Sequence, residues 1–106
     1  MFITDTSSRL KPDQAAEVEL FLANFLPRLE QLPGVAAIYH YAHPEQGDDI
    51  TLIVWESQED AKNYRERSLF KEAFAFEKEL NLASSRKGYP LAYAETAPLK
   101  SGIRQP

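Results

Sequence analysis

Two histidines, His40 and His43, supply the imidazole groups that can exchange protons near neutral pH. His40 lies between Tyr39 and Tyr41, so it is a candidate base if the strand that carries it borders a cavity. Neither histidine has a second metal-ligating residue or an acidic residue at the spacing of a known metal or catalytic motif. The alternative interpretation is that each lies at the surface or in an interface. Cysteine is absent, which excludes thiolate nucleophiles, disulfides and cysteine metal sites.

The length, apolar content and net charge of the chain indicate the number of domains and the kinds of partner to expect. A chain of 106 residues with 43% hydrophobic residues is expected to form one domain over residues 1–97, followed by a loose tail at residues 98–106. The formal charge of −4 is spread along the chain, so the basic stripe that binds nucleic acid is missing. We find no leader pattern and no long apolar run, and therefore expect a cytoplasmic protein without membrane insertion.

The first half of the chain predicts a strand, a helix and a second strand. Residues 1–6 alternate apolar and polar side chains, as a short strand does. A helix is expected to begin near Pro12, with apolar residues on one stripe at Val18, Phe21, Leu22, Phe25, Leu29 and Leu32. Pro27 should kink this helix or divide it after Leu26, and Pro33 with Gly34 should end it.

The second half predicts a hairpin, two helical segments and a last strand. Residues 35–42 and 50–55 have strand patterns on either side of a turn-rich loop. Ser57 is a favourable N-cap for a short helix to about residue 65, and a longer helix restarts near Ser68. Residues 81–87 are polar and predict a loop, whereas residues 91–96 alternate again as a final strand.

This order of elements predicts an α+β fold, a ferredoxin-like βαββαβ protomer with a four-stranded antiparallel sheet and its helices on one face. In the strand at residues 50–55, Ile53 and Trp55 point to one face, and the other apolar residues point to the opposite face. We expect Ile53 and Trp55 on the face without helices, although such exposed apolar surface is uncommon on a monomer. A homodimer that packs sheet against sheet would bury it.

The chain resembles the dimeric α+β barrel superfamily and, within it, the antibiotic biosynthesis monooxygenase-like domains. The resemblance covers roughly residues 2–96, and its most specific parts are LPGV at residues 32–35, VWES at residues 54–57 and EDAKNYRERSLFKEAF at residues 59–74. It implies ferredoxin-like protomers that pair through their sheets. In these families a side chain on the helix after a similar Trp-x-Ser turn reaches a pocket, and Tyr64 stands at that position.

The resemblance also implies a chemistry and a set of site residues. Cofactor-independent monooxygenation of a phenol- or quinol-like substrate requires that the protein deprotonate the substrate, hold the anion and exclude water. The residues that we assign to this task are Tyr64, Asn63 and His40 as catalytic candidates, with Tyr39, Tyr41, Trp55, Phe70 and Phe74 as substrate-binding candidates. Core packing is the simpler explanation for most of these aromatic residues. If the tyrosines beside His40 face the helices, His40 faces the dimer interface.

A haem-degrading branch is also similar, through a Phe-Lys-x-Ala-His segment whose histidine ligates iron. This chain has Phe70 at the start of that segment and Phe74 in place of the histidine. Phenylalanine has no lone pair for iron, and residues 1–10 contain no asparagine to match the one expected on the first strand. We therefore expect no haem, no metal and no organic cofactor.

Three functional hypotheses follow from the sequence and the resemblance. The first is a homodimer that binds a small apolar or aromatic ligand and oxygenates it. The alternative is a non-catalytic binding or stress-associated protein of the same fold. The third is an interaction module whose sheet face binds a different protein, which would be a monomer or a heteromer.

Overall fold

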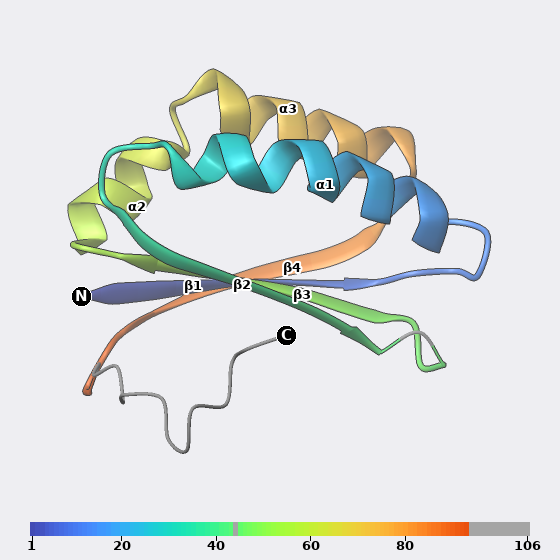
Figure 1. Ribbon diagram of the computed structural model, residues 1–106, viewed down its shortest axis with the longest axis horizontal. Coiled ribbons are helices and arrows are strands. Elements are labelled where there is room, and N and C mark those ends of the chain that lie inside the picture. Colours follow the sequence, from blue (N-terminus) through green and yellow to red (C-terminus); the bar gives the residue numbers. More distant parts are fainter. Residues whose placement is uncertain (44, 94–106) are drawn as a thin grey trace, which may run out of the picture.

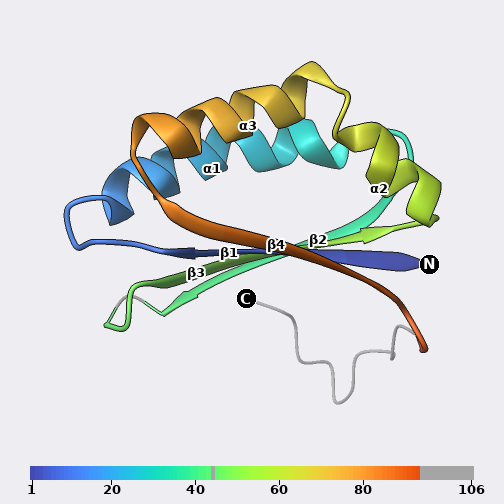
Figure 2. The same cartoon turned by 180° about the vertical axis from the view of Figure 1, so that it is seen from behind.

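The computed structural model describes residues 1–43 and 45–93 of the chain. Its elements are β1 (Phe2–Arg9), α1 (Ala15–Glu30), β2 (Val35–His43), β3 (Asp48–Trp55), α2 (Gln58–Tyr64), α3 (Ser68–Glu79) and β4 (Ala83–Pro90). The strands form an antiparallel sheet in the order β2-β3-β1-β4, and the helices lie together over one face of it (Figure 1, Figure 2). The predicted α+β, ferredoxin-like arrangement is confirmed, with α2 and α3 as the divided second helix.

The helix ends follow from local chemistry, with one difference from expectation. The Ser57 hydroxyl accepts a hydrogen bond from the Asp60 amide at 3.1 Å, which confirms the predicted cap of α2. Pro27 does not divide α1, which runs unbroken from residue 15 to residue 30. Pro27 and Ala23 are both exposed, so water can solvate the Ala23 carbonyl that loses its amide partner.

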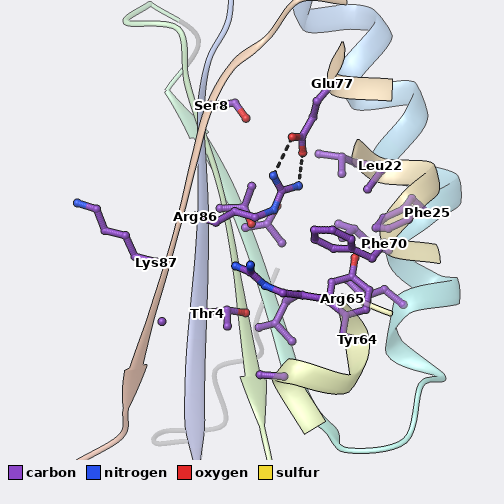
Figure 3. Close-up of a pocket in the computed structure, with 18 of the residues that line it drawn as sticks. Thr4, Ser8, Leu22, Phe25, Tyr64, Arg65, Phe70, Glu77, Arg86 and Lys87 are labelled. Atoms are coloured by element: carbon purple, nitrogen blue, oxygen red, sulfur yellow. Dashed lines mark hydrogen bonds and ion pairs between the residues drawn. The ribbon is translucent and has the colours of Figure 1, made fainter. Parts of the chain in front are cut away.

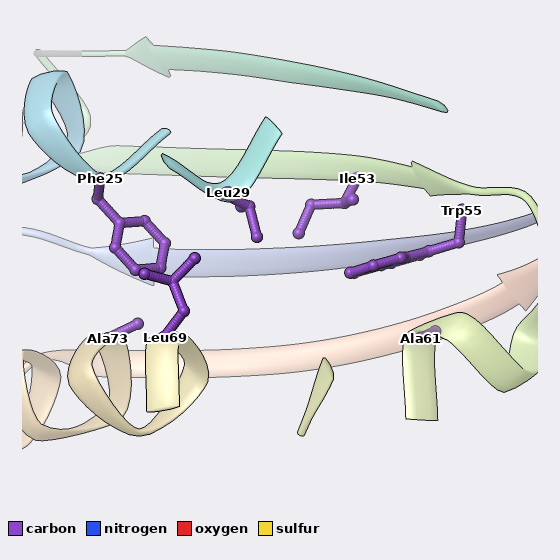
Figure 4. Packing of buried hydrophobic residues seen from close by; sticks show 7 residues of the cluster. All are labelled: Phe25, Leu29, Ile53, Trp55, Ala61, Leu69 and Ala73. Atoms are coloured by element: carbon purple, nitrogen blue, oxygen red, sulfur yellow. The ribbon is translucent and has the colours of Figure 1, made fainter. Parts of the chain in front are cut away.

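The hydrophobic core lies between the helices and β3 (Figure 4). Phe25 of α1 lies beside Leu69 of α3, and Leu29 of α1 lies near Ile53 of β3. Trp55 of β3 is only 1% exposed. The expectation that Ile53 and Trp55 lie on the bare face was wrong. Both faces of β3 are apolar, so its pattern cannot tell which face the helices cover.

The opposite face of the sheet carries the other half of the β3 side chains and their cross-strand partners. Tyr39 pairs with Leu52 and Tyr41 with Ile50, so these tyrosines lie on the face without helices, where they are 59% and 54% exposed. They are therefore not part of a wall between helices and sheet, contrary to expectation. His40 lies between them in sequence, and its side chain consequently points to the helix face.

The last strand also differs from its prediction. It spans Ala83–Pro90, overlapping the loop expected at residues 81–87, and pairs with β1 along its whole length. Residues 91–93 are not in a strand; the rest of the predicted strand, the domain end at residue 97 and the tail at residues 98–106 lie outside the described residues. Among the helices described, none combines the length and the apolar character needed to cross a membrane.

Candidate functional site

A cavity of about 460 Å³ lies between the helix layer and the sheet. Its volume falls in the range of about 300–1,000 Å³ that is typical of small-molecule sites. The helices contribute a mostly apolar roof, from Val18, Phe21, Leu22, Phe25, Leu26, Leu29, Ala61, Tyr64, Phe70, Ala73 and Phe76. This roof would bury the carbon skeleton of a ligand and exclude water from it.

The floor of the cavity is polar because three successive inward positions of β1 are hydroxyl residues. Thr4, Thr6 and Ser8 line the cavity, and Thr51 and Asp49 of the neighbouring β3 lie beside them. In a solid core these positions would favour apolar side chains, since a buried hydroxyl needs a hydrogen-bond partner. The floor therefore suits a ligand that brings oxygen atoms to the sheet.

An ion pair crosses the cavity from the sheet to the helices (Figure 3). Arg86 of β4 donates two hydrogen bonds to Glu77 of α3, with Nη1–Oε1 at 2.9 Å and Nη2–Oε2 at 2.5 Å. The Arg86 guanidinium also lies 5.1 Å from the centre of the Phe70 ring, within cation–π range. These contacts hold a paired positive and negative group at the cavity, whose lining also includes the cationic residues Lys62, Arg65 and Lys87.

Tyr64, at the end of α2, presents a phenol to the cavity. Its ring lies 5.4 Å from the Trp55 ring and 5.2 Å from the Phe70 ring, centre to centre. Burial raises the pKa of Tyr64 to about 12, and the nearby Arg86 and Glu77 act on this pKa in opposite directions. Tyr64 is thus a neutral hydrogen-bond donor at physiological pH.

Asp49 is the buried carboxylate of the cavity floor. Its Oδ2 atom lies 3.0 Å from Nε2 of His40, and the His40 side chain is 27% exposed. His40 belongs to β2, the edge strand of the sheet, so the pair extends from the cavity toward solvent. The structure thereby connects a sequence-predicted residue to a cavity residue that sequence reasoning missed.

The predicted substrate-binding residues separate into three groups. Phe70 lines the cavity. Trp55 does not line it, but its ring contacts the ring of Tyr64, which does. Phe74 lies outside it, stacked on Phe70 and 44% exposed. Tyr39 and Tyr41 are on the far face of the sheet.

The predicted catalytic residues also separate. Tyr64 lines the cavity, and His40 reaches it through Asp49. Asn63 is exposed on α2 and is not among the residues that line the cavity. The structure leaves Tyr64, with His40 behind Asp49, as the members of the predicted set at the cavity.

Sequence reasoning missed Arg86, Asp49 and the hydroxyl row of β1. Arg86 fell in the segment expected to be a loop, and Asp49 fell in the turn-rich loop expected before residue 50, although β3 begins at Asp48. The signal that could have revealed them is the alternation itself: Thr4, Thr6 and Ser8 form a polar row on one side of a strand that a helix layer must cover. Over residues 1–43 and 45–93, no cluster of three or more acidic or histidine side chains forms a possible metal site.

Comparisons with known proteins place the chain among similar folds. Residues 1–75 match the family model described as antibiotic biosynthesis monooxygenase. A structure from Deinococcus radiodurans, named for the same family, superposes with a TM-score of 0.81 at 16% identity, over 92% of this chain and 99% of that chain.

Two further structures are similar. A protein of that family name from Nitrosomonas europaea has a TM-score of 0.71 at 15% identity, over 88% of this chain and 100% of that chain. A conserved protein from Methanosarcina mazei Go1 has a TM-score of 0.73 at 17% identity, over 83% of this chain and 89% of that chain. At these identities the structures establish the fold alone. No curated protein matches the chain.

Proposed function

The chain belongs to the antibiotic biosynthesis monooxygenase family, and from this premise we propose that it oxygenates a phenol- or quinol-like ring in the cavity under the helices. The proposed reaction uses neither a metal nor an organic cofactor. The observation that carries the proposal is the two-sided cavity, with phenyl rings from the helices above and hydroxyl groups from β1 below. A planar ring with oxygen substituents at its edge matches both surfaces.

The substrate supplies the electrons in this chemistry. Removal of a proton from an electron-rich ring system leaves an anion that can reduce dioxygen directly. When a ring C–H position of a phenol becomes a carbonyl, one oxygen atom of dioxygen enters the product. The other leaves as water with the C–H and O–H hydrogens, so atoms and electrons balance. The protein must accept the proton, stabilise the anion and keep bulk water away.

The described side chains suit two of these tasks. Tyr64 can donate a hydrogen bond to a substrate oxygen, since its raised pKa keeps the phenol protonated. Arg86 lies beside it on the ring of Phe70 and supplies positive charge where an anion would form, partly offset by Glu77. The phenylalanines of the roof exclude water and so strengthen both interactions.

We also propose that two protomers pair through the sheet face without helices. Supporting this, Tyr39, Tyr41 and Tyr89 on that face are each more than half exposed. They pair across the strands with the apolar residues Leu52, Ile50 and Ile3, and Val54 pairs with Ile3. Asp5 and Lys87 share this face. A two-fold contact would bury this patch against its own copy.

Oxygen uptake in the presence of fused-ring quinols tests the proposed reaction. We expect consumption above the rate without protein, and a product that contains one atom from isotopically labelled dioxygen. Tyr64→Phe should reduce the rate while the protein remains folded. Binding of the quinol without uptake would instead favour the alternative, a non-catalytic binding protein of this fold.

A further inference from the structure

Asp49 has no task in the chemistry described so far, yet it is among the most buried polar residues of the chain. It is 8% exposed, lies on the cavity floor and faces Ser8 across the β3–β1 pairing. An ionised carboxylate is costly to bury unless donors satisfy it. Such a group in a ligand-sized cavity favours a ligand that brings a donor.

His40 fixes the direction of this carboxylate. Its Nε2 atom lies 3.0 Å from Oδ2 of Asp49, so one carboxylate oxygen is occupied from the β2 side. Within residues 1–43 and 45–93 no hydrogen bond is seen to the second oxygen, Oδ1, which can therefore accept a donor from the cavity. His40 thus acts through Asp49, as a positioning residue.

We propose that Asp49 binds a hydroxyl group of the ligand and makes the cavity selective for neutral ring alcohols over ring carboxylates. This inference rests on the proposed function, since it names the substrate class of the same cavity. A ring hydroxyl donates to Oδ1, whereas a ring carboxylate would place two negative groups together on a buried floor. A ring ether lacks the donor and leaves Oδ1 without a partner.

The position of Asp49 also orients the ligand. Thr51, two residues further along β3, lies about 7 Å away by strand geometry, and it shares a cross-strand row with Thr6 and Arg86. Tyr64 lies toward the Arg86 side of that row, since the Phe70 ring is 5.2 Å from the Tyr64 ring and 5.1 Å from the Arg86 guanidinium. A fused-ring ligand would therefore donate a hydroxyl at the Asp49 end and accept a hydrogen bond from Tyr64 toward the other.

The same hydrogen bond provides an exit for the substrate proton. The O–H bond of the ligand breaks, the proton passes to Oδ1 of Asp49, and the electron pair stays on the ligand oxygen. Asp49 is then the group that accepts the proton, the task for which the sequence suggested His40. No oxidant is needed for this step, since it transfers only a proton.

Two matched ligands test the inference by calorimetry on the full-length protein. In 6-methoxy-2-naphthol one end donates and the other accepts, and 2,6-dimethoxynaphthalene has the same rings without the donor. We expect the naphthol to bind at least about tenfold more tightly, as for a hydrogen bond to a charged group. The corresponding 6-methoxy-2-naphthoate should bind more weakly than either.

Variants assign the preference to Asp49. Asp49→Asn should reduce the preference for the naphthol over the dimethyl ether to less than about threefold, because the acceptor is then uncharged. Asp48→Asn is the matched control, since the neighbouring Asp48 carboxylate pairs with Arg9 outside the cavity. His40→Ala should also lower the preference, and His40→Gln, which keeps an N–H donor, should restore part of it.

The outcomes separate this inference from the function on which it rests. Equal binding of the naphthol and the dimethyl ether by the natural protein would overturn the role of Asp49 and leave the cavity as a ligand site. Tighter binding of the naphthoate would also overturn it, in favour of Arg86 as the anchor. Failure of all three ligands to bind would contradict the inference and the proposed function together.

Discussion

Replacement of Tyr64 by phenylalanine removes one hydroxyl group from the cavity and leaves the aromatic packing in place. The ring contacts with Trp55 and Phe70 do not involve the hydroxyl, and no hydrogen bond from it is seen within residues 1–43 and 45–93. We therefore expect the free energy of unfolding to change by less than about 1 kcal/mol. Ligand binding should respond differently.

A net hydrogen bond contributes about 0.5–1.5 kcal/mol, so Tyr64→Phe should weaken the binding of 6-methoxy-2-naphthol about 2- to 13-fold. Tyr39→Phe is the matched control, because Tyr39 carries the same hydroxyl on the far face of the sheet. Calorimetric titration of both variants gives the affinities, and thermal melting gives their stability. Equal affinity in the two variants would refute the placement of Tyr64 in the ligand site.

Three further predictions concern the core, the sheet face and the buried phenol. Leu29→Ala should lower the free energy of unfolding by about 2–5 kcal/mol, because Leu29 is only 1% exposed; a loss below about 1 kcal/mol in denaturant titration would contradict this packing. Leu52→Lys should convert the proposed dimer to monomers in light scattering, whereas Leu20→Lys, on the exposed side of α1, should leave the mass unchanged; a dimeric Leu52→Lys variant would place the interface elsewhere. The pKa of Tyr64 is raised in the folded state from the ordinary 10.0 to about 12, so its stabilising contribution is complete below pH 10 and is lost as the pH rises from 10 to 12. The natural protein should therefore lose more stability than Tyr64→Phe across that interval, and parallel losses would argue against burial of the phenol.

The order and type of most elements could be predicted because each has a local signal. The stripe of apolar residues on α1 and the Ser57 cap of α2 both act over a few residues, and both are confirmed. The face of each strand has no such signal when both of its faces are apolar. Side chains on a strand alternate with a strict period of two. One wrong choice of the face that the helices cover therefore placed Trp55, Tyr39 and His40 on the wrong faces together.

The second failure, at β4, occurred where the strand borders the cavity. Ser84 and Arg86 face the helices, where a solid core would have apolar residues, so the strand did not alternate in the expected way. Arg86 is tolerated there because it donates two hydrogen bonds to Glu77 and its side chain stays 22% exposed. Local rules thus failed where the sheet borders the proposed ligand site.

The most direct test of the central claim is to locate a bound ring by nuclear magnetic resonance. Addition of 6-methoxy-2-naphthol to isotopically labelled protein should shift the amide signals of residues that line the cavity, with Thr6, Thr51 and Phe70 as reporters. The signals of Tyr39 on the far face of the sheet and of the exposed Leu20 on α1 should stay unchanged. Shifts confined to the sheet face without helices, or no shifts at saturating ligand, would contradict a ligand site between the helices and the sheet.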